Sequence, residues 1–303
     1  MARVNLNTLP ISTGKKARLH RILYEHGPGN GTALLLPIDH GLEHGPIDFL
    51  DNPDALNPEW ELRLAKEAGY SGIVFQIGIA EKYMRDFAGE VPLILKLNGR
   101  TNVPSEEYAL SPLNATVEDA VRLGADAVGY TLYVGSPLQA DDLAQFRRVR
   151  SDCDRYAMPL IVWAYPRGKA IEEKGGRDSL YAIDYAARAA AELGADMVKV
   201  NVPKFEDARM GQLPKPYSNM RMSMTDAIAK VVQSASGVPV LISGGSKLGD
   251  EDLLNRARAS LESGACGLIF GRNIFQRPYP QALEISRRIA EMMRQTKSEG
   301  TAF

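Results

Sequence analysis

The sequence predicts a single (β/α)8 barrel of the TIM type with an N-terminal extension. Eight short apolar runs recur along its 303 residues, and segments with helical spacing separate them. The runs are continuously apolar, as expected of parallel strands that are covered on both faces. The count of eight favours a closed barrel over an open doubly wound sheet. The expected strands cover residues 33–39, 72–78, 92–98, 127–134, 160–165, 197–202, 238–243 and 267–271.

The helical segments carry start and stop signals of their own. The first ends in Gly69, a residue type that is common where helices terminate. The second opens with Thr116 and has Asp119 three residues later, which resembles a capping box. Helices are therefore expected over 58–70, 116–125, 179–195 and 248–265.

Three segments frame the predicted domain organisation. Residues 1–32 are expected to form a helical extension, 33–296 the barrel, and 297–303 a short tail. The glycine-rich stretch 27–31 precedes a strand, whereas a phosphate-cradling loop follows one, so we interpret it as an ordinary loop. The long segment 203–222 follows the sixth strand and is expected on the catalytic rim.

Composition excludes several classes of partner. The chain has 36 basic and 37 acidic residues, so its net charge of −1 favours neither nucleic acid nor an anionic membrane. No run of about 18 apolar residues could span a membrane, and the first residues lack the apolar core of a signal peptide. Two cysteines make no disulfide framework. We expect a cytoplasmic protein.

Polar residues gather where the predicted strands end, which is where such barrels build active sites. Because alternate strand residues share a face, Lys199 and Asn201 point the same way, as Trp163 and Tyr165 do. Lys96 and Asn98 form a third such pair. The candidate site residues from strands one, three, five and six are Asp39, His40, His44, Lys96, Trp163, Tyr165, Arg167, Lys199 and Asn201.

The last two strand ends have the composition of a phosphate site. Ser243, Gly244 and Gly245 follow strand seven, and Gly271 and Arg272 follow strand eight. Barrels commonly bind phosphate with these two loops, through backbone N–H groups and a guanidinium. The alternative is that the glycines only turn the chain.

Lys199 stands inside a predicted strand, where an unpaired ammonium is costly. Burial in an apolar pocket lowers the pKa of a lysine, and a neutral amine can attack a ketone to form a Schiff base. The protonated imine then withdraws electrons, so that a neighbouring carbon–carbon bond can break. Tyr165 is suited to proton transfer, and Asp39 to assisting the carbinolamine step. The alternatives are an ion pair of Lys199 with Asp39 or Asp126, and Tyr165 as a space-filling aromatic.

A metal site is not favoured. His40 and His44 are possible ligands, but the two other histidines, His20 and His26, precede the barrel. A compact cluster on several strands is therefore hard to assemble.

Seven motifs together resemble the archaeal-type (DhnA-like) class I fructose-bisphosphate aldolases. They are LLLPIDHGLEHGP, LILKLNG, VGYTLYVGS, VWAYPRG, DMVKVNVP, LISGGSK and GLIFGRN, spread over residues 33–280. The resemblance implies reversible cleavage of fructose 1,6-bisphosphate to dihydroxyacetone phosphate and glyceraldehyde 3-phosphate, in glycolysis and gluconeogenesis, without a metal or other cofactor. It also implies a homo-oligomer, often a pentamer-based decamer.

The same resemblance assigns roles to residues. Lys199 forms the imine, Tyr165 transfers protons, Asp39 belongs to the catalytic group, and Trp163 lines the substrate site. Phosphate contacts fall on Ser243, Gly244, Gly245, Gly271 and Arg272, and those for a second phosphate on Arg167 with His44 nearby. Lys96 is carried over as a further substrate contact.

Other functions stay open at this point. Related Schiff-base enzymes, an aminodideoxyheptulosonate synthase and a thiolase for a phosphorylated signal, also keep the lysine, and Trp163 favours the aldolase. A sugar-phosphate isomerase without an imine needs an inward glutamate, yet Glu43 and Glu172 are expected in loops. A non-catalytic sugar-phosphate-binding protein leaves Lys199 and Tyr165 without a role.

Overall fold

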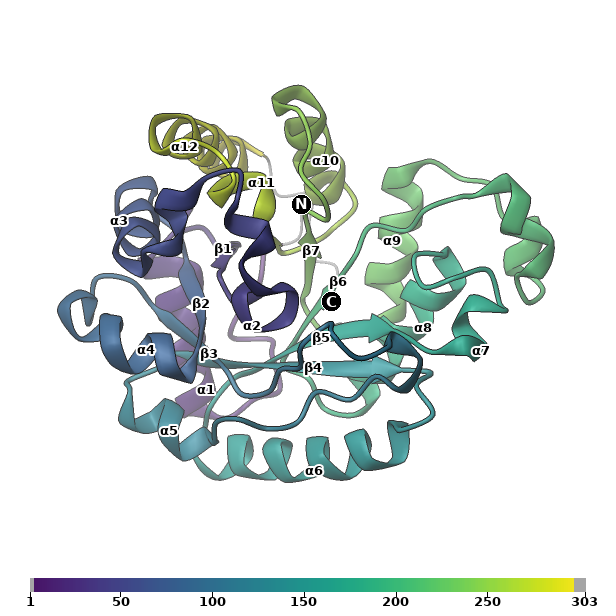
Figure 1. The fold of residues 1–303 in the computed structure, drawn as a ribbon, viewed down its shortest axis with the longest axis horizontal. Helices are drawn as coiled ribbons and strands as arrows, with labels where there is room; N and C mark the ends of the chain where they lie inside the picture. Colours follow the sequence, from purple (N-terminus) through teal and green to yellow (C-terminus); the bar gives the residue numbers. More distant parts are fainter. Residues whose placement is uncertain (1–2, 297–303) are drawn as a thin grey trace.

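The computed structural model describes residues 3–296 and contains a closed barrel of eight parallel strands in the order β1 to β8 (Figure 1). Every predicted strand is confirmed, and the fold class with it. Their bounds are β1 Ala33–Pro37, β2 Gly72–Gln76, β3 Leu93–Lys96, β4 Ala127–Val134, β5 Leu160–Pro166, β6 Met197–Val200, β7 Val240–Ser243 and β8 Gly267–Ile269.

The strand register brings the predicted chemistry onto one part of the wall. Lys96 of β3 is paired with Gly129 of β4, and Trp163 of β5 with Lys199 of β6. Leu35 of β1 pairs with Ile269 of β8 and closes the ring. Residues that are distant in sequence therefore lie side by side on neighbouring strands of the wall.

Helices surround the barrel and begin and end where the sequence indicates. The capping box of Thr116 and Asp119 is present, Gly69 adopts the left-handed conformation after its helix, and Ser179 caps another. Their bounds are α1 Thr13–His20, α2 His40–His44, α3 Pro58–Ala68, α4 Ile77–Tyr83, α5 Val117–Arg122, α6 Gln139–Arg155, α7 Lys169–Glu172, α8 Leu180–Glu192, α9 Met224–Ser234, α10 Asp250–Glu262, α11 Arg272–Phe275 and α12 Tyr279–Gln295. Within residues 3–296, no helix has the length and apolarity that a membrane crossing requires.

Two apolar clusters hold the molecule together. The larger one fills the layer between the strands and the surrounding helices. The smaller one fills the barrel interior and includes Val74, Ile161 and Leu241. The N-terminal extension contributes Leu19 and Ile22 to this interior cluster.

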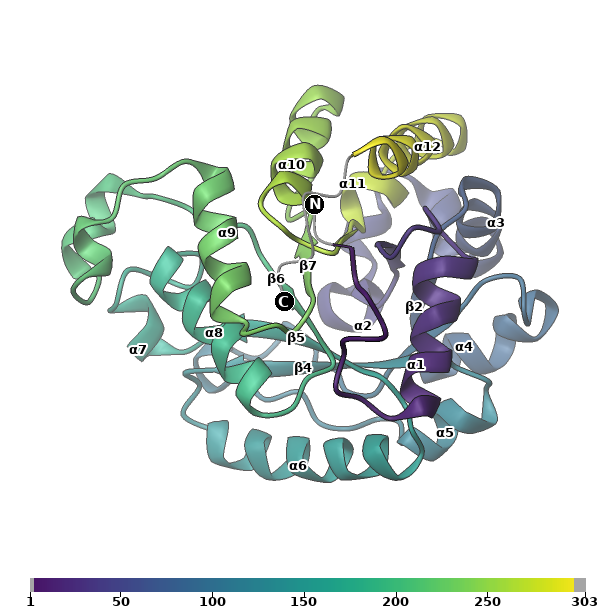
Figure 2. The ribbon, with the colours of Figure 1, turned by 180° about the vertical axis from the view of Figure 1, so that it is seen from behind.

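The extension closes the amino end of the barrel. Arg18 donates a hydrogen bond to the carbonyl of Ala125, which precedes β4 (2.7 Å), and Lys15 pairs with Asp196, which precedes β6 (2.9 Å). Figure 2 shows α1 on the near side, whereas α2 is on the near side in Figure 1. The two ends of the barrel are thus covered by different segments. The predicted tail, 297–303, lies outside the described residues.

Candidate active site

A cavity of about 390 Å³ opens at the carboxyl ends of the strands. All predicted site residues except Lys96 line it: Asp39, His40, His44, Trp163, Tyr165, Arg167, Lys199, Asn201, Ser243, Gly244, Gly245, Gly271 and Arg272. The long segment after β6 reaches it through Lys204. The residues selected from the strand ends therefore converge on one place.

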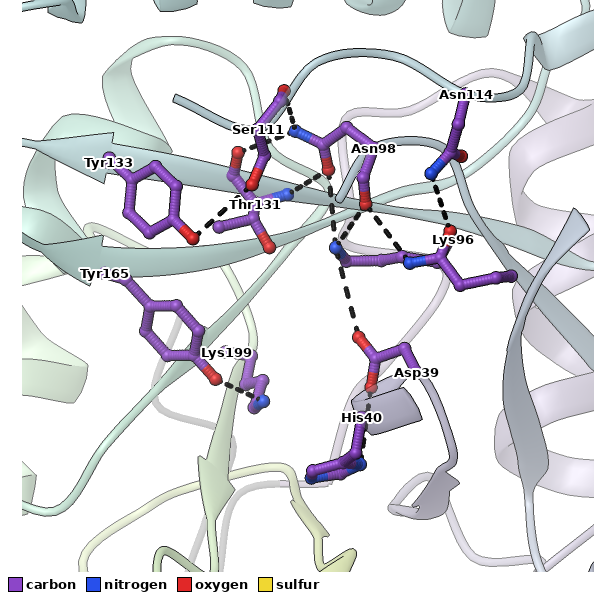
Figure 3. Close-up of polar contacts among 11 residues, drawn as sticks. Asp39, His40, Lys96, Asn98, Ser111, Asn114, Thr131, Tyr133, Tyr165 and Lys199 are labelled. Atoms are coloured by element: carbon purple, nitrogen blue, oxygen red, sulfur yellow. Dashed lines mark hydrogen bonds and ion pairs between the residues drawn. The ribbon is translucent and has the colours of Figure 1, made fainter. Parts of the chain in front are cut away.

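Lys199 is buried without an ionic partner. Its side chain is nearly enclosed, and Nζ donates a hydrogen bond to Tyr165 Oη at 2.5 Å (Figure 3). No carboxylate of residues 3–296 lies within 4.0 Å of Nζ, so the alternative of an ion pair is wrong. Asp126 instead pairs with Arg21 at the amino end of the barrel (3.4 Å).

Burial makes this amine a nucleophile. Loss of water lowers the pKa of Lys199 to about 8, and the negative charges of Asp39 and Glu43 offset only part of that effect. With such a pKa, roughly a tenth of the amine is neutral near pH 7, far more than for an exposed lysine. The neutral fraction is the form that can add to a carbonyl.

A proton donor and a carboxylate stand beside the amine. Burial, reinforced by the carboxylates of Glu43 and Asp39, raises the pKa of Tyr165 well above its ordinary value, so the phenol keeps its proton. Burial alone would raise the pKa of Asp39, but favourable charge interactions, led by that with the Lys96 ammonium, outweigh it and hold that pKa below the ordinary value. Asp39 is therefore a carboxylate at neutral pH.

The pKa values of the two histidines are shifted in opposite directions. Burial lowers the pKa of His40 to about 4, so its imidazole is neutral, and it packs edge-on against Phe275. The hydrogen bond to Asp48, whose Oδ2 lies 2.5 Å from Nδ1, raises the pKa of His44. Among residues 3–296, no group of three or more His, Cys, Asp or Glu side chains is arranged to hold a metal ion.

The loops after β7 and β8 form an anion cradle. The backbone N–H groups of Gly244, Gly245 and Gly271 have no acceptor in the described chain, and Ser243 Oγ donates to Asn201 Oδ1 (2.6 Å). A Cβ at Gly271 would lie 2.5 Å from the His40 ring, so only glycine fits there. Unpaired N–H groups in such a loop attract anions, and Arg272 on the cavity wall adds a cation.

A second basic cluster, formed by Arg167, Arg177 and Lys204, lies on the same cavity. Only Arg167 was predicted from the sequence. The Arg167 guanidinium stacks over Tyr165 (5.3 Å) and lies 3.5 Å from Glu106. Arg177 pairs with the same glutamate, and Lys204 also lines the cavity. These residues come from loops after β3, β5 and β6 that carry no periodic signal, so a single sequence holds no indication of their meeting.

Three predictions need correction. Lys96 is only 2% exposed and does not line the cavity, because it lies deeper in the barrel, so the structure does not support its direct contact with substrate. Glu43 was expected in a loop, but it belongs to the short helix α2 and lines the cavity. Glu172, which was also expected in a loop, ends the short helix α7 and does not line this cavity.

A (β/α)8 barrel with a buried, partly neutral lysine beside a phenol has the architecture of a Schiff-base enzyme. Residues 33–277 match the DeoC/LacD family aldolase, and the chain belongs to this family.

The chain is also similar to individual curated proteins and to a solved structure. The chain is 44% identical to a class 1 fructose-bisphosphate aldolase of Thermoproteus tenax, over 87% of this chain and 90% of that protein. It is 32% identical to a 2-amino-3,7-dideoxy-D-threo-hept-6-ulosonate synthase of Halobacterium salinarum, over 89% and 88% respectively. An archaeal fructose-1,6-bisphosphate aldolase, solved with its catalytic lysine covalently bound to the carbinolamine intermediate, is 40% identical. It covers 92% of this chain and 98% of its own, with a TM-score of 0.77.

Proposed function

We propose that this protein is a class I fructose-bisphosphate aldolase, which reversibly cleaves fructose 1,6-bisphosphate to dihydroxyacetone phosphate and glyceraldehyde 3-phosphate. The observation that carries the proposal is the Lys199 amine, buried without a counter-ion and 2.5 Å from the Tyr165 phenol. The 44% identical relative and the structure with a lysine-bound intermediate support it.

The reaction begins when the neutral amine of Lys199 adds to the substrate ketone. The carbinolamine so formed loses water and becomes a protonated imine. The imine accepts the electron pair of the bond between the carbon next to it and the following, hydroxyl-bearing carbon. That hydroxyl gives its proton to the Asp39 carboxylate as its carbon leaves as the aldehyde, which balances the proton that the enamine later takes up. The remaining enamine takes up a proton at carbon, and water then hydrolyses the imine and restores the lysine.

Tyr165 and Asp39 handle the protons of this sequence. The phenol is protonated at rest, so it can give its proton to the enamine carbon. The Asp39 carboxylate lines the same cavity and can take up and return the proton that the carbinolamine step moves. Trp163 forms the floor beneath Lys199, with its ring centroid 5.2 Å from Nζ.

The two basic regions suit a substrate with two phosphates. One phosphate meets the unpaired N–H groups of Gly244, Gly245 and Gly271 with Arg272. The other meets Arg167, with His44, Asn201 and His40 completing the wall between them. Binding energy from the phosphates positions the ketone at the amine.

Reductive trapping tests this chemistry. Borohydride added with dihydroxyacetone phosphate should inactivate the protein irreversibly and increase the mass of the peptide that contains Lys199. The variant Lys199→Met should fold and show neither effect. Wild-type protein that stays unmodified would contradict the proposal and favour an isomerase or a binding protein.

The heptulosonate synthase is a second candidate, because one relative with that name is 32% identical over most of both chains. Turnover should be compared on fructose 1,6-bisphosphate, fructose 1-phosphate and the heptulosonate precursors. The aldolase is expected to prefer the bisphosphate, since both basic regions are then occupied. A preference for the heptulosonate precursors would reverse the assignment while leaving the imine chemistry in place.

We also propose that cleavage needs no metal, because the imine itself supplies the electron sink. Activity is expected to survive dialysis against a chelator, and loss that added divalent metal restores would contradict this.

We also propose a cellular location, a pathway and an assembly state for the protein. We place the protein in the cytoplasm, in glycolysis or gluconeogenesis, as a homo-oligomer that is pentamer-based. Light scattering of the purified protein tests the assembly, and a monomer would contradict it.

A further inference from the structure

Two buried lysines lie close to one indole in the barrel interior. Lys96 Nζ lies 5.5 Å and Lys199 Nζ 5.2 Å from the ring centroid of Trp163. Gly129 makes the room, because a Cβ there would lie 2.7 Å from the indole and 3.0 Å from Lys96 Cδ. Two ammonium groups so enclosed repel each other, and burial removes most of the water that would solvate them.

The Asp39 carboxylate is shared unequally between the two lysines. Its Oδ2 lies 3.9 Å from Lys96 Nζ (Figure 3), whereas no carboxylate of the described chain lies within 4.0 Å of Lys199 Nζ. Several titratable groups act on Lys199. From the segment after β1 they are Asp39, His40 and Glu43; from β3 Lys96; from β5 Tyr165; and from the loop after β8 Arg272.

Lys96 is held in its place by a hydrogen-bond network. Its Nζ donates to the carbonyl of Asn98 (2.8 Å). The Asn98 side chain donates to the carbonyls of Ser111 (3.1 Å) and Thr131 (2.9 Å) and accepts from the N–H of Thr131 (2.7 Å). This anchoring keeps the ammonium next to Asp39 and out of the cavity lining.

We propose that Lys96 is a positioning residue for the reacting amine: it retains the Asp39 carboxylate and so leaves Lys199 without a counter-ion. The inference rests on the proposed imine chemistry, which needs a neutral Lys199. Lys96 acts in a second way, since its own charge disfavours an ammonium nearby. After burial, Lys96 is one of the charges that lower the pKa of Lys199.

Direct titration of Lys199 tests the role of Lys96 without relying on catalysis. The extent to which a trace of acetic anhydride labels Lys199 is measured against pH by mass spectrometry. In Lys96→Met the labelling midpoint should rise by about one pH unit or more, because the freed carboxylate turns to Lys199. Reductive trapping with dihydroxyacetone phosphate at about pH 7 should slow about tenfold for the same reason.

Two further variants test the cause of the rise in the labelling midpoint: a double variant and a control. Adding Asp39→Asn to Lys96→Met should reverse the rise, because the carboxylate that causes it is gone. The exposed Lys82 gives the matched control, since Lys82→Met removes a positive charge far from the cavity and should leave the midpoint unchanged.

The possible results distinguish failure of the role proposed for Lys96 from failure of the proposed function. If Lys96→Met lowers the melting temperature and leaves the midpoint in place, the residue is only structural and the inference is overturned. It is equally overturned if the rise persists in the double variant. Should Lys96→Met not fold, Lys96→Gln keeps a donor for the Asn98 carbonyl and removes the charge, with the same expected rise. Wild-type protein that labels at Lys199 but never traps the substrate would overturn the proposed function instead, and the midpoints would still decide the role of Lys96.

Discussion

Lys199 owes its chemistry to its surroundings. An exposed lysine is almost entirely a cation at neutral pH, whereas burial brings the pKa of Lys199 to about 8. The Tyr165 phenol, 2.5 Å away, keeps its proton because its pKa is raised. A lysine with a reactive neutral fraction and a protonated phenol are thereby placed together.

The pH dependence of imine formation follows from that pKa. The rate of reductive trapping should increase as the pH rises through about 8 and level off above it, since only the neutral amine attacks and its fraction saturates. Single-turnover trapping in a series of buffers measures the profile. A rate that is flat from about pH 6 to about pH 9 would contradict the lowered pKa.

Removal of the phenol should separate imine formation from cleavage. Tyr165→Phe fills nearly the same space, so Lys199 should still be trapped as an imine, while turnover on the bisphosphate falls about 10²- to 10⁴-fold through loss of the proton donor. Mass spectrometry and steady-state assays give the two readouts. Equal loss of both would instead assign Tyr165 to holding the lysine.

At the scale of elements, strand β4 matters because one of its residues, Gly129, has no side chain and leaves room for a neighbour. Gly129 of β4 has an ordinary backbone conformation, so its lack of a side chain matters for room alone. The space beside Gly129 is occupied by the Trp163 indole, which lies close to both lysines. The position of the indole therefore depends on a residue that does not line the cavity.

Gly129→Ala should disturb the indole. A methyl group 2.7 Å from the indole forces Trp163 to move, at a cost of about 1–3 kcal/mol in the free energy of unfolding, and activity should fall with it. Urea denaturation measures the stability. Gly78→Ala in α4 is the matched control, because nothing lies within 4 Å of its Cβ, and it should be neutral or slightly stabilising. Unchanged stability and activity of Gly129→Ala would show that the floor adjusts freely.

At the scale of the whole molecule, chemistry and closure occupy opposite ends of the barrel. The cavity lies at the carboxyl ends of the strands, and α1 covers the amino ends, where Arg18 and Lys15 attach it. Apolar side chains of the extension complete the interior cluster. Stability and activity should therefore be separable.

Leu19→Ala tests that separation. The side chain is fully buried in the interior cluster, so its truncation should lower the free energy of unfolding by about 2–5 kcal/mol. The KM for the bisphosphate should stay near the wild-type value, because the cavity is lined by other segments. A large rise in KM in folded protein would show that the two ends are coupled.

The residues on strands were predictable because geometry repeats there. Alternation within a strand put Lys199 and Asn201 on one face, and the barrel brings all carboxyl ends together. A sequence pattern does not show how far inside the barrel a strand residue lies. Lys96 was therefore predicted to contact substrate, although it lies beneath the cavity and does not line it. Arg177, Lys204 and Glu106 stand on loops, where no period relates sequence to position.

The amino-acid sequence by itself determined the barrel, four of the helices that surround it and the polar residues at the strand ends, because local periodicity and capping are properties of neighbouring residues. Only the tertiary structure decided which lysine meets Asp39 and which remains unpaired. That choice depends on distances between β1, β3 and β6 inside the closed barrel. Electrostatic energies vary steeply with such distances in a medium without bulk water, and no pattern along the chain encodes them.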